Sequence, residues 1–216
     1  MIVSNKFGYL YVHIPKTGGS SMRSVLNRLR WRDPLYYMQF ICSRFSHWSG
    51  HKTGTKFPRH ARIIAAKEML PKPYFDSLFK FAIVRNPWDV QVSAYHHIKR
   101  DHPHLLGKYQ SFEDYLKYRF DPARSWDYFI DGLSQPQMSY LVDLDGSVLV
   151  DFMGRFERLE EDVRNIFKTL GLDLNLPHHR KEKSRKDYRK YYNLETIELV
   201  QTHYQRDIEF LSYSFE

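Results

Sequence analysis

Cysteine is almost absent from this sequence. Cys42 is the single cysteine among 216 residues, which excludes an internal disulfide and a zinc cluster built from cysteines. A lone thiol is typical of proteins from a reducing compartment. Long hydrophobic runs are lacking too, because stretches such as residues 9–12 and 81–84 are far shorter than the roughly 20 residues of a membrane span. We therefore expect a soluble, cytoplasmic protein.

The first residues also lack the pattern of a leader. Residues 1–7 contain no basic region that runs into an apolar stretch, so no signal peptide is predicted. Glycine and proline are scarce, at 10 each, whereas Tyr, Phe and Trp number 16, 15 and 4. This aromatic content excludes a disordered chain, because it offers enough apolar area to offset the entropy of ordering. At about 150 residues per domain, residues 1–216 are expected to form one domain.

Acidic residues are outnumbered, and the excess of positive charge is local. The chain carries 33 Lys and Arg against 25 Asp and Glu, a net charge of +8. Residues 178–192 hold seven of the basic side chains and two of the acidic ones, which is +5 of that total. Such a segment suits a small polyanion, a nucleic acid or a solvated face, and charge alone leaves the three open.

Two segments have the order strand, tight loop, helix. Residues 8–14 and 80–84 are short apolar runs rich in aromatic and β-branched residues, as in buried parallel strands. Helical spacing of apolar residues follows each of them, over 22–31 and 88–100. Residues 32–59 contain several breakers and are predicted to be irregular.

The remainder of the chain is predicted to be mostly helical. Asp145-Gly146 lies between apolar residues and predicts a hairpin turn, since it supplies the positive φ values that a tight turn needs. The other predicted elements are helices over residues 61–70, 112–118, 126–130, 137–141, 159–170 and 194–211.

The loop after the first strand has the residues of an anion-binding site. Glycines let backbone N–H groups approach a phosphate, a helix start adds unpaired donors, and a lysine adds a mobile charge. The order differs from the Gly-x4-Gly-Lys-Ser/Thr loop that binds ATP, because here the lysine precedes the glycines. A plain glycine turn is the alternative. The candidate binding residues are Lys16, Thr17, Gly18, Gly19, Ser20 and Ser21.

The turn after the second strand repeats this arrangement with an arginine. Arg85 stands at the predicted strand end and Ser93 follows in the next helix. A guanidinium gives a planar, bidentate contact and a hydroxyl adds a hydrogen bond, so the pair suits a ribose phosphate. An ordinary salt bridge is the alternative for Arg85.

These segments resemble a known family. Residues 14–21 are similar to the 5′-phosphosulfate loop, and residues 84–95 to the 3′-phosphate motif, of sulfotransferases that use 3′-phosphoadenosine 5′-phosphosulfate (PAPS). The carbohydrate-sulfotransferase branch is the most similar. Two positions depart from its pattern: Ser20 replaces a common threonine and keeps the hydroxyl, whereas Val90 replaces an arginine and removes a charge. The resemblance continues at residues 150–160, 176–178, 187–192, 207–208 and 213–215.

The resemblance implies an α/β fold, with a central, mainly parallel sheet flanked by helices and P-loop-like phosphate loops. It implies transfer of a sulfuryl group from PAPS to an acceptor hydroxyl, on a carbohydrate, with no metal and no nucleic-acid partner. In-line transfer needs a base for the hydroxyl proton and a cation at the leaving oxygen. Lys16 fits the role of the cation. A phosphotransferase and a catalytically silent polyanion-binding protein are the alternatives.

Histidine suits the base because its unperturbed pKa lies near neutral pH. His60 is the first candidate, since carbohydrate sulfotransferases look similar at this position, and His51, His47 and Glu68 follow. His47 and His51 have the spacing of two zinc ligands but lack the glutamate of His-Glu-x-x-His.

The basic stretch near the C-terminus is the last candidate. Lys183 and Arg185 are predicted to close over the cofactor, as basic loops do in the similar family. A solvated connector is the alternative.

Overall fold

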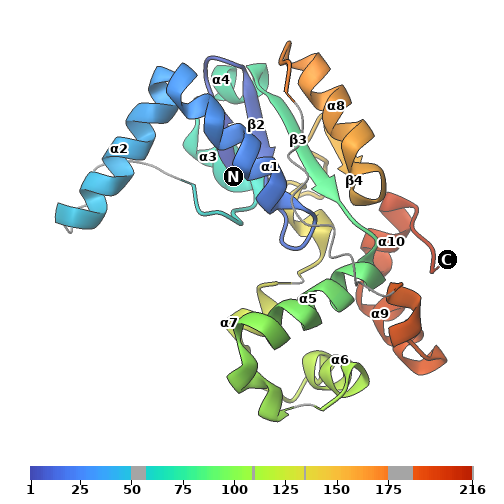
Figure 1. Cartoon of the computed structure of the whole chain (residues 1–216). Helices are drawn as coiled ribbons and strands as arrows, with labels where there is room; N and C mark the ends of the chain where they lie inside the picture. Colours follow the sequence, from blue (N-terminus) through green and yellow to red (C-terminus); the bar gives the residue numbers. More distant parts are fainter. Residues whose placement is uncertain (50–56, 109, 134, 175–186, 216) are drawn as a thin grey trace. The chain divides into compact units, whose positions relative to one another are not determined.

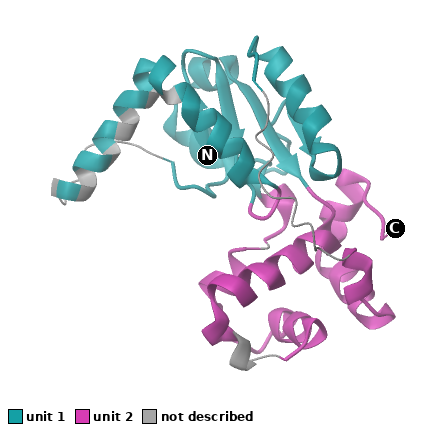
Figure 2. Ribbon diagram, viewed as in Figure 1, with its two compact units in different colours: residues 1–14, 18–84, 140–179 teal, residues 15–17, 85–139, 180–216 magenta. Residues whose placement is uncertain are grey.

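The structure is a computed structural model that describes residues 1–49, 57–108, 110–133, 135–174 and 187–215. The chain divides into two compact units (Figure 2). Unit 1 comprises Met1–Ile14, Gly18–Val84 and Tyr140–His179, and unit 2 comprises Pro15–Thr17, Arg85–Ser139 and Arg180–Glu216. Each unit is described by itself below. The expectation of a single domain stays a prediction.

Unit 1 contains the sheet. Its four described strands are β1 (Ile2–Ser4), β2 (Tyr9–Val12), β3 (Phe79–Val84) and β4 (Phe152–Arg155), in the spatial order β1-β2-β3-β4 (Figure 1). β3 pairs in parallel with both β2 and β4, and β1 pairs antiparallel with β2. The α/β class and the mainly parallel sheet are thus confirmed. Because parallel strands end at one edge of a sheet, β2 and β3 deliver the following loops from the same side.

Unit 1 also contains helices. They are α1 (Gly19–Arg28), α2 (Pro34–Ser49), α3 (Ile63–Met69), α4 (Lys72–Ser77) and α8 (Leu159–Thr169), with short 3₁₀ turns at Leu29–Arg32 and Phe156–Arg158. Of these helices, α1 and α8 pack on the sheet. On one face of the sheet, alternate strand residues such as Tyr11 and Phe81 pack against Leu26 of α1 and Phe167 of α8. These four side chains are at most 1% exposed. Their burial fixes α1 against the sheet, and α1 begins immediately after the loop that follows β2.

The prediction that residues 32–59 are irregular is wrong for the part that forms α2. Pro34 is the first residue of this helix, a position that tolerates proline because its missing N–H has no partner inside the helix. Residues 50–56 lie outside the described residues. The predicted turn at Asp145-Gly146 is confirmed: Val142 and Val148 form an antiparallel bridge, and Gly146 has a φ of 88°.

Unit 2 is helical. It contains α5 (Pro87–Asp101), α6 (Phe112–Phe120), α7 (Tyr128–Asp131), α9 (Leu194–His203) and α10 (Gln205–Leu211), with 3₁₀ turns at Pro103–Lys108, Gln137–Tyr140 and Tyr188–Tyr191. Its core joins Trp88 and Val92 of α5 to Tyr115 of α6 and Val200 of α9.

The final helix is not continuous as predicted. It breaks at Tyr204, which leaves the helical region with φ −116° and ψ 21°. The ring of Tyr204 stays buried, and its hydroxyl accepts a hydrogen bond from Arg119 Nη2 at 2.8 Å.

None of the helices that the structure describes combines the length and apolar character of a bilayer-crossing segment.

Candidate functional site

Two glycines shape the start of α1, each for a different reason. Gly18 has a φ of 82°, in the left-handed region that favours glycine. A Cβ there would also meet Phe156 and Leu159 at 3.0–3.2 Å. Gly19 has no room for a side chain, because an added Cβ would lie 1.8 Å from Nε2 of His13. The imidazole of His13 therefore lies directly against the Cα of Gly19.

The N-terminus of α1 suits an anion. Among the described residues no side chain caps it, and its first turn contains no acidic residue. The first N–H groups of a helix have no partner within the helix, and the helix dipole is positive at this end. Ser20 is exposed and Ser21 half-buried in this turn. The partial positive charge of the turn favours negatively charged oxygens, and their binding here stays a prediction.

His60 is tied to the end of β2 through a main-chain atom. Its Nδ1 lies 2.9 Å from the carbonyl oxygen of His13, and the two rings are 4.5 Å apart between centroids. A carbonyl only accepts, so His60 Nδ1 carries the hydrogen. In the neutral ring the lone pair is then on Nε2. His60 is held as the tautomer that accepts a proton at Nε2.

Both histidines are disposed to stay neutral. Burial, and next the electrostatic effect of the neighbouring His60 ring, lower the pKa of His13 from 6.5 to about 2. Burial lowers the pKa of His60 as well, although the hydrogen bond to the His13 carbonyl opposes this. A neutral imidazole at neutral pH is the form that a general base requires.

In unit 2, Arg85 holds the loop that contains Lys16. Its guanidinium is 3% exposed, and Nη1 donates to the carbonyl oxygen of Lys16 at 2.8 Å. Nε donates to Asp89 Oδ2 at 2.7 Å, and Nη2 lies 2.6 Å from the same oxygen. Lys16 itself has a φ of 65°, a conformation that costs a residue with a side chain about 1–2 kcal/mol. The arginine thus stabilises a strained loop residue.

A further pair of buried side chains fixes Arg85. Gln137 receives a hydrogen bond from the main-chain N–H of Arg85 at 2.9 Å and donates to its carbonyl at 2.7 Å. Asp207 in turn accepts from the N–H groups of Gln137 and Met138 at 2.6 and 2.9 Å. Burial raises the pKa of Asp207. The main chain of Arg85 is therefore held on both sides.

Ser93 lies on the same face of α5 as Asp89, the carboxylate that pairs with Arg85. Asp89, Ser93 and His97 are spaced four residues apart, which places them in one row along the helix. Burial, and next the positive charge of Lys16, lower the pKa of His97. Arg85 contacts both the Lys16 carbonyl and Asp89 of this row, so unit 2 brings together Lys16, Arg85 and the face that carries Ser93.

A comparison with known families matches residues 1–214 to the model described as the sulfotransferase family. The chain belongs to this family. The match supports a transferase, and in general terms a sulfotransferase activity; members of the family generally use PAPS. An uncharacterized protein from Archaeoglobus fulgidus is 36% identical to this sulfotransferase over 102 residues, which is 47% of this chain and 74% of that protein.

Several predicted site residues of this sulfotransferase are not described. Lys183, Arg185 and His51 lie outside the described residues, and of His47 only the place in α2 is described. Glu68 is exposed on α3. Val90, where the family pattern has arginine, is buried in α5 at 3% exposure, so an apolar contact replaces a charge there.

Sequence reasoning assigned no role to four residues around the loops: His13, Asp89, Gln137 and Asp207. The first two carried a signal, because His13 directly follows a strand and Asp89 is one helical turn after Arg85. Asp207 carried only its place in the family resemblance, at residues 207–208, and Gln137 carried no signal. Their partners are 70 and 52 residues away.

Proposed function

We propose that this sulfotransferase moves the sulfuryl group of PAPS to a hydroxyl of a carbohydrate acceptor. The observation that carries the proposal is the start of α1. It has Gly18 at a positive φ, Gly19 with no room for a side chain, and a helix N-terminus that no described side chain caps and whose first turn has no acid. This arrangement fits an anion, and PAPS is the anion that family members generally use.

The chain offers groups for both ends of the cofactor. Lys16, Thr17 and the first turn of α1, with Gly18, Gly19, Ser20 and Ser21, would bind the 5′-phosphosulfate. Arg85 and Ser93 would bind the 3′-phosphate, and Lys183 and Arg185 would cover the cofactor. Since Asp89 engages Nε and Nη2 of Arg85, a phosphate on Arg85 would compete with that carboxylate. When bound, PAPS supplies the sulfuryl group.

His60 is the proposed base. Its Nδ1–H is engaged by the carbonyl of His13, so Nε2 accepts the proton of the acceptor hydroxyl. Lys16 is the proposed cation, whose ammonium balances the negative charge that grows on the leaving oxygen. A carbohydrate acceptor and a cytoplasmic location rest on the resemblance and on the single cysteine, respectively.

The test is transfer of a radioactive label from [³⁵S]PAPS to separate pools of saccharides, small alcohols, lipids and tyrosine-containing peptides. The proposal expects label on the saccharides. Label on another pool would contradict the carbohydrate acceptor but keep the sulfotransferase. Transfer of label from [γ-³²P]ATP, with none from [³⁵S]PAPS, would establish the phosphotransferase alternative.

A further inference from the structure

The positive charge of this protein is concentrated in its first third. Residues 1–67 contain twelve Lys and Arg and a single acid, Asp33, a net charge of +11. The remaining residues contain 21 basic and 24 acidic side chains, a net charge of −3, which restores the total of +8. The N-terminal charge thus exceeds that of the whole chain.

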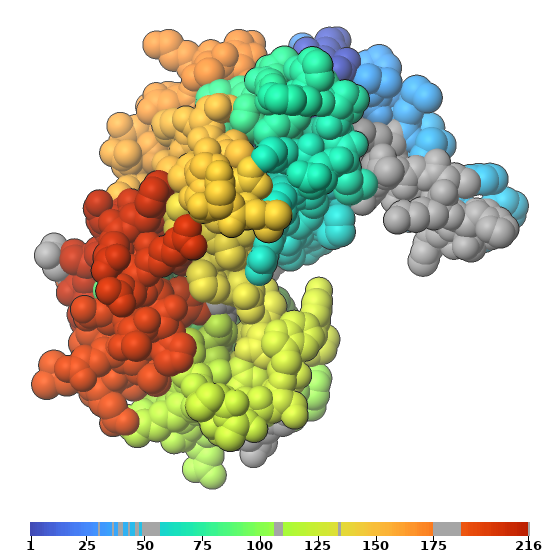
Figure 3. All heavy atoms as spheres, turned by 180° about the vertical axis from the view of Figure 1, so that it is seen from behind, coloured from blue at the N-terminus to red at the C-terminus, as the bar shows by residue number. Residues whose placement is uncertain are grey.

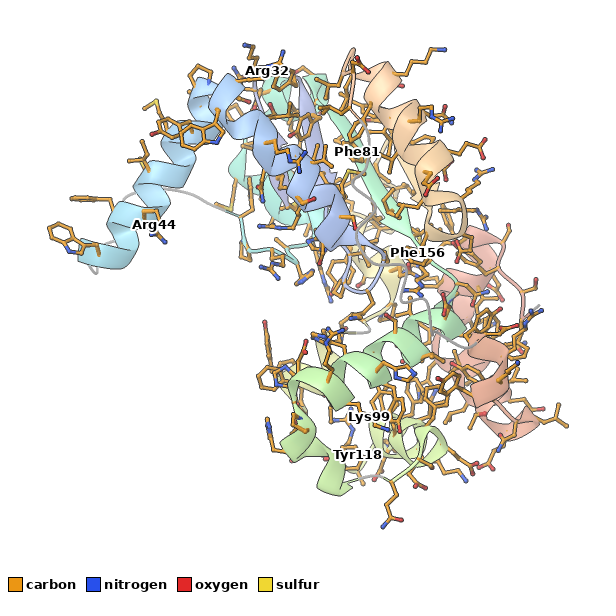
Figure 4. The ribbon with its side chains drawn as sticks, in the orientation of Figure 1. Arg32, Arg44, Phe81, Lys99, Tyr118 and Phe156 are labelled. Carbon is orange, nitrogen blue, oxygen red and sulfur yellow. The ribbon has the colours of Figure 1, made fainter. Side chains whose placement is uncertain are left out.

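The single acid does not offset this charge at the surface. Asp33 is 1% exposed and accepts hydrogen bonds from the hydroxyl of Ser4 and the N–H of Lys6. Three arginines of this segment are exposed: Arg28 at the end of α1, Arg32 just before α2, and Arg44 on α2; Figure 4 labels the last two. The surface of α2 and the turn before it therefore carries arginines without an exposed acid in the same 67 residues.

Apolar side chains accompany these arginines. The helix α2 projects away from the sheet of unit 1, as Figures 1 and 3 show. Trp31, in the 3₁₀ turn before this helix, and Trp48, in its last turn, are 74% and 82% exposed. Between them, side chains three or four residues apart form a stripe that is about half exposed to water: Leu35, Met38, Ile41 and Phe45.

We propose that this surface, Trp31 and the α2 stripe with Arg28, Arg32 and Arg44, binds the surface of a membrane that contains anionic phospholipids. Helices that lie in the membrane interface combine a row of Trp, Phe and Leu with basic residues, and bind through apolar burial and attraction to anionic headgroups. Both components are present here. The inference concerns where the enzyme works and is independent of the proposed transfer chemistry.

A second copy of the chain fits this surface less well. The helix has sixteen residues, which is about 24 Å and two heptads, fewer than the three or four that a sustained coiled coil needs. Arg44 follows Ile41 of the stripe by three residues, and α2 has no acid with which a second copy could pair it.

A polyanionic saccharide or nucleic acid fits less well too. It would satisfy the arginines, but it would leave the stripe from Leu35 to Trp48 in water. Burial of such side chains is favourable, and only an apolar phase provides it. A lipid surface complements both the charge and the stripe.

The test is co-sedimentation of the full chain, without nucleotide, with vesicles of phosphatidylcholine alone or with roughly 30% phosphatidylglycerol. Wild type should bind the anionic vesicles, and less so at high salt. The variant Arg28→Gln/Arg32→Gln/Arg44→Gln should bind them about 100-fold more weakly, at about 1 kcal/mol per basic residue. Met38→Glu and Phe45→Glu should each weaken binding by about tenfold or more.

Leu144→Glu is the matched control, because it also replaces an exposed apolar residue of unit 1, 91% exposed, with a glutamate. It should bind like wild type, and circular dichroism should show all variants folded. Three results would overturn the proposal: no binding of wild type to anionic vesicles; equal loss in Leu144→Glu; or a dimer that Met38→Glu dissociates while vesicle binding is unchanged. Retention on heparin without vesicle binding would assign the face to a polyanion instead.

Discussion

His13 contacts His60 and Gly19 with different parts of one residue. Its carbonyl oxygen accepts from His60 Nδ1 at 2.9 Å, and its imidazole occupies the space that a side chain on Gly19 would need. The end of β2 thus orients the proposed base and sets the shape of the anion loop together. A change in His13 should therefore affect both.

The contact with Gly19 can be measured by a double-mutant cycle. Gly19→Ala places a Cβ inside the His13 ring, so we expect the free energy of unfolding to fall by about 1–3 kcal/mol, as for other overpacked cores. In a His13→Ala background the ring is gone, and the same change should cost almost nothing. Urea titrations of wild type, Gly19→Ala, His13→Ala and the double variant measure the cost of Gly19→Ala in both backgrounds. Equal costs in the two backgrounds would show that the ring does not fill this space.

The pKa of His13 predicts loss of stability in mild acid. Because burial lowers its folded-state pKa from 6.5 to about 2, the unfolded chain binds the proton first as the pH falls. This contribution to stability is complete above pH 6.5 and declines below it by up to about 1.4 kcal/mol per pH unit. Between pH 7 and pH 5, wild type should lose about 2 kcal/mol more than His13→Gln. Identical losses in the two proteins would contradict the buried, neutral His13.

Lys16 combines strain with function. Glycine at this position relieves the positive φ of 65°, so Lys16→Gly should be as stable as wild type or more stable, by up to about 1 kcal/mol. It should nevertheless lose about 100-fold or more in kcat, because the cation at the leaving oxygen is gone. Thermal unfolding and turnover of the same sample give both values.

Ser212→Gly is the control for Lys16→Gly. Among the described residues other than glycine, Lys16 and Ser212 are the two with a positive φ, and that of Ser212 is 50°. This change should stabilise the protein without affecting turnover. If Lys16→Gly keeps full turnover, the role of the lysine in catalysis is wrong.

Loss of His60 should affect the pH profile as well as the rate. His60→Ala should lower kcat by about 10²- to 10⁴-fold, leave cofactor affinity nearly unchanged and remove the acidic limb. In wild type that limb should have its midpoint below pH 6.5, because burial lowers the pKa of His60. Initial rates between pH 5 and pH 9 would measure it.

His203 provides the comparison, because its Nδ1 has the same kind of bond, 2.8 Å from the Leu199 carbonyl, at an exposed site. His203→Ala should be kinetically silent. A stable His60→Ala with an unchanged profile would shift the assignment of the base to His51, His47 or Glu68.

The sequence predicted the parts of the fold in which local signals agree with the structure. The runs before Pro15 and Arg85 formed β2 and β3, since apolar strands followed by tight turns are recognisable locally. β4 was not predicted because it contains Gly154, a residue depleted in strands. Neighbouring side chains lie close to this glycine, since an added Cβ would lie 2.8 Å from Ile83 Cδ1 and 3.1 Å from Asp162 Cβ.

The candidate site was predictable only as far as its residues are close in sequence. The residues of the glycine loop and Arg85 were identified from their motifs. The residues that hold Arg85 in place were not identified. Gln137 bonds the main chain of Arg85, and Asp207 bonds the main chain of Gln137, but folding brings these residues together from distant parts of the sequence. The helix α2 was missed because Pro34 was interpreted as a breaker, although it begins the helix.

The most direct test of the central claim is a calorimetric titration of wild type and Arg85→Ala with 3′-phosphoadenosine 5′-phosphate, adenosine 5′-phosphosulfate and ATP. Wild type should bind 3′-phosphoadenosine 5′-phosphate most tightly. Arg85→Ala should lose about 2–5 kcal/mol for that ligand. The loss of binding free energy should be smaller for adenosine 5′-phosphosulfate. This ligand lacks the 3′-phosphate, so its binding is weakened only because the Lys16 loop loses its hydrogen bond to Arg85. Preference of the wild type for ATP, or no binding of 3′-phosphoadenosine 5′-phosphate, would contradict the account.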